Sequence, residues 1–155
     1  MPRYRPNIAA ILQDDRGRIL VAERIGISGA WQFPQGGIDR GEKKTEALKR
    51  EVREELGLAE TCYQPLFSRS GYRYEFPRDH GRRGSWTGQE QTYVLCRFLG
   101  TDADIDLRQD DPEFVDFRWI FPHEFQLVWL PEFKRGVYRQ VFRDFFDIDL
   151  CPDGP

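Results

Sequence analysis

The segment that decides the fold spans residues 36–58 and reads GGIDRGEKKTEALKREVREELGL. Within it, Thr45–Leu56 has the spacing of a helix, because Leu48, Val52 and the last residue of the range recur every four residues as one apolar stripe. Thr45 is a candidate N-cap, and the glycine that follows the range stands where a helix-ending glycine belongs. We therefore expect this helix to pack one flank against a core.

Three glutamates occupy another flank of the same helix. Glu51, Glu54 and Glu55 stand at positions i, i+3 and i+4, so they share one face. Like charges at this spacing repel each other, and a hard cation such as Mg²⁺ removes that penalty because it prefers oxygen ligands. The alternative is a solvated charged face with the basic residues of Lys49–Arg53 as counterions.

The stretch ahead of the helix is rich in glycine. Gly26–Gly41 holds five glycines and one proline, which predicts a loop. Gly36 and Gly37 permit a tight turn and let backbone oxygens or amides approach a metal or a phosphate closely. Gly36 is therefore a candidate metal contact.

The complete pattern is a glycine, five residues, a glutamate, seven residues and the string REVREELGL. It begins at Gly36, with the glutamate at Glu42 and the string at Arg50. It resembles the Nudix box at every defining position. The resemblance implies an α/β (α+β) fold, an α/β/α sandwich with a mixed sheet, in which Arg50 and Glu42 form an orienting ion pair. It also implies hydrolysis of a nucleoside diphosphate linked to a further group, with Mg²⁺, Mn²⁺ or another divalent cation.

Four stretches outside the box narrow the resemblance. They are YRPN at 4–7, WQFPQGG at 31–37, PEF at 112–114 and FKRGVY at 133–138. These look like the bacterial RNA 5′ pyrophosphohydrolases, a subfamily also described as diadenosine polyphosphate hydrolases. The match covers roughly residues 4–146; it is weakest at residues 78–88, and the long basic tail of some members is absent.

The resemblance implies a set of metal and catalytic residues. Glu51, Glu54 and Glu55 would be metal-binding carboxylates, together with Gly36, and Glu113 would be an additional ligand. The alternative for Glu113 is an ordinary acid in an acidic surface loop. One carboxylate would also activate water, and we assign catalysis to Glu54 and Glu51, with Glu54 as the general base.

The same resemblance implies substrate contacts. Arg5, Arg24 and Lys134 would bind phosphates or the nucleotide, although each also fits a solvated surface charge. Tyr74 and Phe133 would stack on a base, since such stacking contributes about 1–3 kcal/mol per base. Phe133 also fits a core position, because it continues the apolar stripe of a C-terminal helix.

Three functions fit these residues. The first is removal of pyrophosphate from the 5′-triphosphate end of RNA, which by family resemblance promotes mRNA decay. The second is hydrolysis of dinucleoside polyphosphates. The third is a catalytically silent Nudix-fold protein that binds nucleotides or RNA, and the intact acidic face argues against it.

A polar loop is predicted at Arg78–Gly88. Arg82, Arg83 and Trp86 suit single-stranded RNA, because basic side chains follow its backbone and aromatic rings stack on its bases. The alternative is a solvated loop that happens to be basic. Isolated histidines at His80 and at position 123 have no ligand partner in the sequence, so we expect structural or surface roles for them.

The rest of the chain supplies strands and a second helix. Val137, Val141 and Phe145 continue a spacing of four from Phe133, which predicts an amphipathic helix on a sheet. A DDRG turn at 14–17 predicts a hairpin between the first two strands. The expected strands are Asn7–Gln13, Arg18–Arg24, Tyr63–Ser68, Tyr72–Phe76, Gln91–Leu99 and Phe117–Phe121.

Composition sets the broad class. A length of 155 residues suggests one domain, residues 1–155, and 22 aromatic residues supply its core. The net charge of -3 excludes a strongly basic protein that coats nucleic acid. An acidic enzyme that binds polyphosphates would need divalent cations between its own negative charges and those of the substrate.

Features that the sequence lacks predict the cellular location of the protein and the redox state of its cysteines. It has no run near the roughly 18 apolar residues of a membrane span and no apolar leader, so we expect a cytoplasmic protein without a membrane partner. Cys62, Cys96 and Cys151 show no metal-ligand spacing, and we expect reduced, structural thiols. The oligomeric state stays open.

Overall fold

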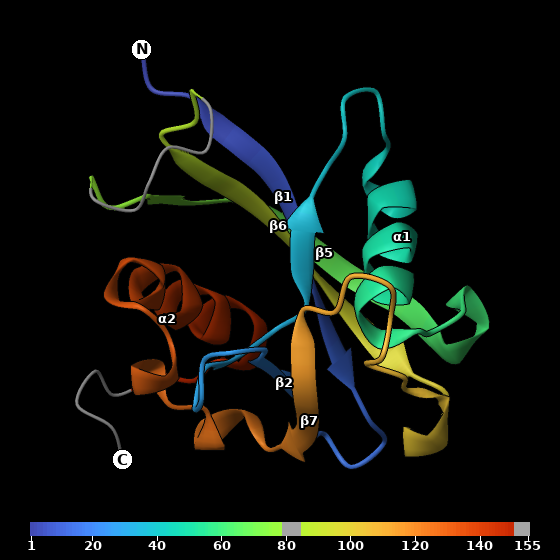
Figure 1. The fold of residues 1–155 in the computed structure, drawn as a ribbon. Helices are drawn as coiled ribbons and strands as arrows, with labels where there is room; N and C mark the ends of the chain where they lie inside the picture. The colour runs from blue at the N-terminus through green and yellow to red at the C-terminus, as the bar shows by residue number, and fades with distance from the viewer. Residues whose placement is uncertain (79–84, 151–155) are drawn as a thin grey trace.

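The structure is a computed structural model that describes residues 1–78 and 85–150 (Figure 1). Within those residues, seven strands form one sheet and two α-helices lie against it. The strands are β1 (Tyr4–Gln13), β2 (Ile19–Arg24), β3 (Trp31–Gln32), β4 (Gln35–Gly37), β5 (Tyr63–Glu75), β6 (Gly88–Phe98) and β7 (Phe114–Ile120). The helices are α1 (Lys44–Leu56) and α2 (Glu132–Phe146), and short 3-10 helices occupy Glu60–Cys62, Asp102–Asp104, Pro122–Glu124 and Leu127–Trp129.

The sheet is built around β1. Its strand order is β3-β2-β1-β6-β5, with β4 added to β1 and β7 added to β2. β1 runs parallel to β6 over the whole length of β1, while the other pairings in the described chain are antiparallel. The predicted mixed sheet is therefore confirmed, as is the hairpin between β1 and β2.

Alternating side chains of β1 feed two separate cores. Ile8, Ala10 and Leu12 are buried with the apolar stripe of α1, whereas Ala9 and Ile11 are buried with α2. This alternation follows from the two-residue period of a strand. One helix therefore covers each face of the sheet, as Figure 1 shows, and the predicted α/β/α layering is confirmed.

The box helix α1 ends as predicted but begins earlier than predicted. Gly57 adopts a left-handed conformation with φ of 68° and donates its N–H to Arg53 O at 2.9 Å. Thr45 is not the N-cap: in the described chain the cap position is Lys43, whose side chain makes no capping bond. The physical reason is a turn in which the N–H of Glu42 donates to Asp39 O, because this turn delivers the chain into the helix before Thr45.

Two strand predictions are also corrected. The expected loop Gly26–Gly41 contains β3 and β4, because these short strands pair with β2 and β1 respectively. The expected strands Tyr63–Ser68 and Tyr72–Phe76 are one strand, β5. Its pairing with β6 shifts register near Gly71, which has φ of 93°, so the glycine forms an irregularity and does not end the strand.

The predictions for the histidines, the cysteines and the basic loop can be compared with the structure only where it describes these residues. His80, Arg82, Arg83 and Cys151 lie outside the described residues. Cys62 and Cys96 are free thiols among the described cysteines, and His123 is exposed, as predicted. No α-helix in the described ranges is long and apolar enough to cross a membrane.

Candidate active site

Arg50 ties the box loop to the box helix. Its guanidinium donates to both carboxylate oxygens of Glu42, at 2.8 and 2.9 Å, and to Gly37 O at 2.8 Å. It also donates to Glu51 Oε1 at 2.7 Å. The hydrogen bond from Arg50, followed by one from the Asp39 amide, lowers the pKa of Glu42 to about 2. The predicted orienting ion pair is therefore present.

The two glycines of β4 make room for charged groups of opposite sign. A Cβ atom on Gly36 would overlap the carboxylate of Glu51, and one on Gly37 would overlap the guanidinium of Arg5. Any larger residue would displace one of these side chains. The glycine pair thus lets an acid from α1 and a base from β1 reach the same short strand.

Glu55 is the buried acid of the helix. Glu55 is only 6% exposed, and the backbone N–H of Gln35 donates to its Oε2 at 3.2 Å. Burial, followed by the neighbouring Glu51 and the charge of Glu113, raises the pKa of Glu55 well above its ordinary value. A cation bound between these carboxylates would remove that repulsion.

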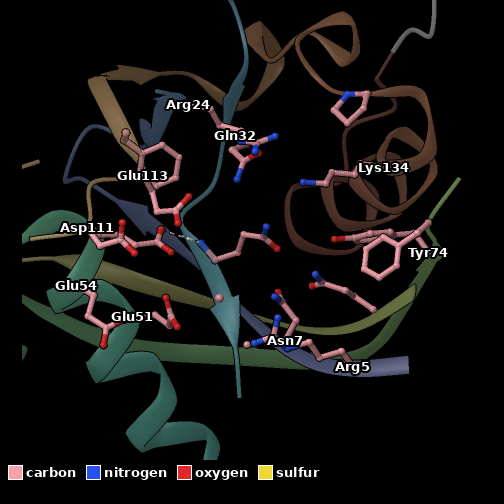
Figure 2. A pocket seen from close by; sticks show the side chains of 18 of the residues that line it. Arg5, Asn7, Arg24, Gln32, Glu51, Glu54, Tyr74, Asp111, Glu113 and Lys134 are labelled. Atoms are coloured by element: carbon pink, nitrogen blue, oxygen red, sulfur yellow. Dashed lines mark hydrogen bonds between the residues drawn. The ribbon is translucent and has the colours of Figure 1, made fainter. Parts of the chain in front are cut away.

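Glu54 is the exposed acid of the helix. Its side chain is 57% exposed, compared with 12% for Glu51, and it lies 3.3 Å from Arg50 Nη1. The three helical acids therefore line one cavity, as their spacing predicted, but they differ sharply in contact with solvent. In Figure 2, Glu51 and Glu54 project from α1 on the side where Asp111 and Glu113 also lie.

Every residue predicted for the site lines a single cavity of about 760 Å³. The members are Gly36, Glu51, Glu54, Glu55, Glu113, Arg5, Arg24, Tyr74, Phe133 and Lys134. Figure 2 shows the labelled acids on one side and Arg24, Lys134 and Tyr74 on the others. The cavity therefore has an acidic end that suits cations and a basic and aromatic end that suits anionic nucleotides.

The aromatic end is packed. Tyr74 is 6% exposed, and the centroid of its ring lies 5.5 Å from that of Phe133 and 6.0 Å from that of Phe76. Lys134 Nζ lies 6.0 Å from the Tyr74 ring centroid. Phe133 is half-buried: it packs against the core and also lines the cavity, and its stacking on a base stays a prediction.

The Glu113 loop brings further acids that the sequence analysis did not assign to the site. Asp110 and Asp111 line the cavity beside Glu113. The Ile25 amide donates to Glu113 O at 2.9 Å, which anchors this loop beside the end of β2. Glu113 is exposed to solvent and lines the same cavity as the box acids.

A floor of carboxamides is the second feature that was missed. Asn7, Gln32, Gln35 and Gln89 line the cavity, and Gln91 lies beneath them. They come from β1, β3, β4 and β6, with Gln89 and Gln91 on one strand, so nothing local in the sequence groups the whole set. The available signal was weak: polar residues inside otherwise apolar strands, at positions that share a face.

The donor atoms at the acidic end fit a hard divalent cation. Carboxylates and backbone carbonyls are oxygen ligands, which Mg²⁺ and Mn²⁺ prefer. The burial and neighbouring acids that raise the pKa of Glu55, and the space that Gly36 leaves beside Glu51, agree with such a cation. Across residues 1–78 and 85–150, no group of three acidic, histidine or cysteine side chains is placed closely enough to hold a metal ion.

Comparisons with known proteins agree with this geometry. The model of the NUDIX domain family matches residues 3–144. A protein named RNA pyrophosphohydrolase from Erythrobacter litoralis (strain HTCC2594) is 42% identical over 151 residues, which cover 92% of this chain and 91% of that protein. Another of the same name, from Helicobacter pylori (strain ATCC 700392 / 26695), is 43% identical over 148 residues and covers 92% and 94%.

Solved structures show the same fold at lower identity. The Escherichia coli dihydroneopterin triphosphate pyrophosphohydrolase has a TM-score of 0.64 and 16% identity, over 92% of this chain and 97% of that one. A binary complex of Caenorhabditis elegans Ap4A hydrolase has a TM-score of 0.62 and 14% identity, over 92% and 99%. At these identities the likeness concerns the fold alone.

Proposed function

This chain belongs to the Nudix family, and from that we propose that it removes pyrophosphate from the 5′-triphosphate end of RNA and so promotes RNA decay. The observation that carries the proposal is the single cavity, whose acidic end faces a basic and aromatic end. The relatives named RNA pyrophosphohydrolase support the choice of substrate. We treat residues 1–155 as one catalytic domain.

We assign the acidic end to the metal and to proton transfer. Nudix hydrolases depend on divalent metals, and here Glu51, Glu55, Glu113 and Gly36 would hold Mg²⁺ or Mn²⁺. When bound, such a cation neutralises phosphate charge and acidifies the attacking water. Glu54 would accept the proton from that water, because its side chain reaches solvent while remaining in the cavity lining.

We assign the basic end to the substrate. Arg5, Arg24 and Lys134 would bind phosphates that the acids do not face. Burial of Lys134, which is 9% exposed, and the position of Arg5 over Gly37 hold two of these cations in fixed places. The half-buried Phe133 would offer the outer part of its ring to a base.

A comparison of substrates tests the proposal. With Mg²⁺, we expect kcat/KM for a triphosphorylated RNA of a few nucleotides to exceed that for a free nucleoside triphosphate by about tenfold, since one more stacked base contributes about 1–3 kcal/mol. Diadenosine tetraphosphate should be a poorer substrate than the RNA. A clear preference for the dinucleotide would replace the RNA assignment with the rival function, and no turnover of any of them would indicate a binding protein.

Replacing Glu113 by alanine tests the extra metal ligand. We expect the variant to need at least about tenfold more Mg²⁺ or Mn²⁺ for half-maximal activity, because even residues outside the inner ligand set change metal affinity by roughly 10–100-fold. Asp116→Ala is the matched control, since Asp116 is an exposed acid on β7, the strand that directly follows Glu113. Titration curves for Glu113→Ala and wild type that superimpose would reject the ligand role.

A further inference from the structure

Gln89 occupies the cavity floor with an unsatisfied buried group. The residue is 6% exposed, and its Oε1 has no hydrogen-bond partner among the described residues. Its neighbours in the sheet are Arg5 on β1 and Tyr74 on β5, both of which also line the cavity. Gln89 therefore stands in a row across three strands, between a cation and an aromatic ring.

Its neighbour on the same face of β6 behaves differently. The Gln91 Nε2 donates to Asn7 Oδ1 at 3.0 Å and to Gln35 Oε1 at 2.8 Å. Its Oε1 accepts a hydrogen bond from the Tyr93 hydroxyl at 2.7 Å. The hydrogen bonds within the fold thus satisfy the Gln91 side chain, whereas they leave the side-chain oxygen of Gln89 without a partner among the described residues.

An unsatisfied buried acceptor is expensive, by about 1–3 kcal/mol, so a donor is expected when the cavity is filled. An ionised polyphosphate carries oxygens and no donors, so it cannot satisfy this group. The exocyclic amino group of a nucleobase can, and the aromatic pair Tyr74 and Phe133 beside Gln89 suits the plane of a base.

We propose that Gln89 reads the base of the substrate, with its side-chain oxygen accepting a hydrogen bond from an exocyclic amino group. The inference rests on the proposed nucleotide chemistry of the cavity and adds a specificity residue to it. Asn7 and Gln35 do not share this role, because each accepts a bond from Gln91. If the side-chain amide were turned so that its nitrogen met a phosphate, Gln89→Met would weaken all substrates alike.

The test uses short 5′-triphosphorylated RNAs in pairs that differ by one amino group. The pairs are adenosine against purine riboside and guanosine against inosine, placed at the first or the second nucleotide. For at least one pair we expect wild type to lose about three- to tenfold in kcat/KM without the amino group, the range of one hydrogen bond. Gln89→Met should lower the amino-bearing substrate to the same level and abolish the difference within the pair.

Gln91→Met is the matched control, since it changes the same residue type on the same face of the strand. It should affect all substrates alike, because it disturbs the floor without removing the reading oxygen. Equal loss of all substrates in Gln89→Met, or no amino preference in wild type, would overturn the inference. Absence of an amino preference in wild type would overturn the inference even if Gln89→Met fails to fold, and failure of wild type to hydrolyse any RNA would instead reject the proposed function.

Discussion

Replacing Glu54 by glutamine should lower kcat with saturating Mg²⁺ by at least about 100-fold, the lower end of general acid–base effects. The amide of glutamine keeps the size of the side chain but cannot accept a proton at neutral pH. The fold should be unaffected, because the Glu54 side chain is 57% exposed and its ion pair with Arg50 is a surface pair. The checks are steady-state kinetics and thermal unfolding.

Glu46→Gln is the control for this change. Glu46 lies on the same helix and is exposed, but it does not line the cavity. It should retain wild-type kcat. A folded Glu54→Gln enzyme with near wild-type turnover would transfer the base role to another acid.

Much of the site could be predicted because its key spacing is local. The apolar stripe of α1 and the three glutamates beside it follow from the period of a helix, and Gly57 follows from the left-handed conformation that ends it. The distant contacts Arg5, Glu113 and Lys134 came from motif resemblance. The structure places all of them in one cavity.

The difference between Glu54 and Glu55 could not be predicted from spacing. Adjacent residues on a helix diverge by about 100°, and which one is buried depends on where the helix docks. Here the amide of Gln35 on β4 receives Glu55, while Glu54 faces outward. β4 forms only by pairing with β1, so the local sequence around it predicts a loop.

The carboxamide floor was missed for a related reason. Asn7, Gln89 and Gln91 come together through the parallel register of β1 and β6. Such pairing joins residues more than eighty positions apart, and no local pattern reports it. The continuity of β5 was missed because a local signal was misleading. Gly71 resembles a strand end in the sequence, but in the structure it is an irregularity within one strand.

Replacing Glu55 by glutamine should separate stability from activity. In the metal-free fold, burial and the nearby Glu51 and Glu113 raise the pKa of Glu55 above its ordinary value of 4.5. The unfolded chain therefore releases this proton as pH rises above about 4.5, while the folded chain retains it. Glu55 consequently lowers the free energy of unfolding as pH increases, by up to about 1.4 kcal/mol per pH unit. A glutamine has no such proton to lose.

Thermal unfolding in EDTA between about pH 5 and pH 8 measures this effect. Near pH 8, Glu55→Gln should unfold at least about 2–4 °C above wild type, the shift that one kcal/mol produces in a domain of this size. Its Tm should also fall less with pH. Saturating Mg²⁺ should stabilise wild type more than the variant, because the cation favours the carboxylate, and the variant should lose at least about 100-fold in kcat/KM. Parallel pH profiles for both proteins in EDTA would show that the pKa of Glu55 is not raised in the metal-free fold, and Glu46→Gln should follow wild type throughout.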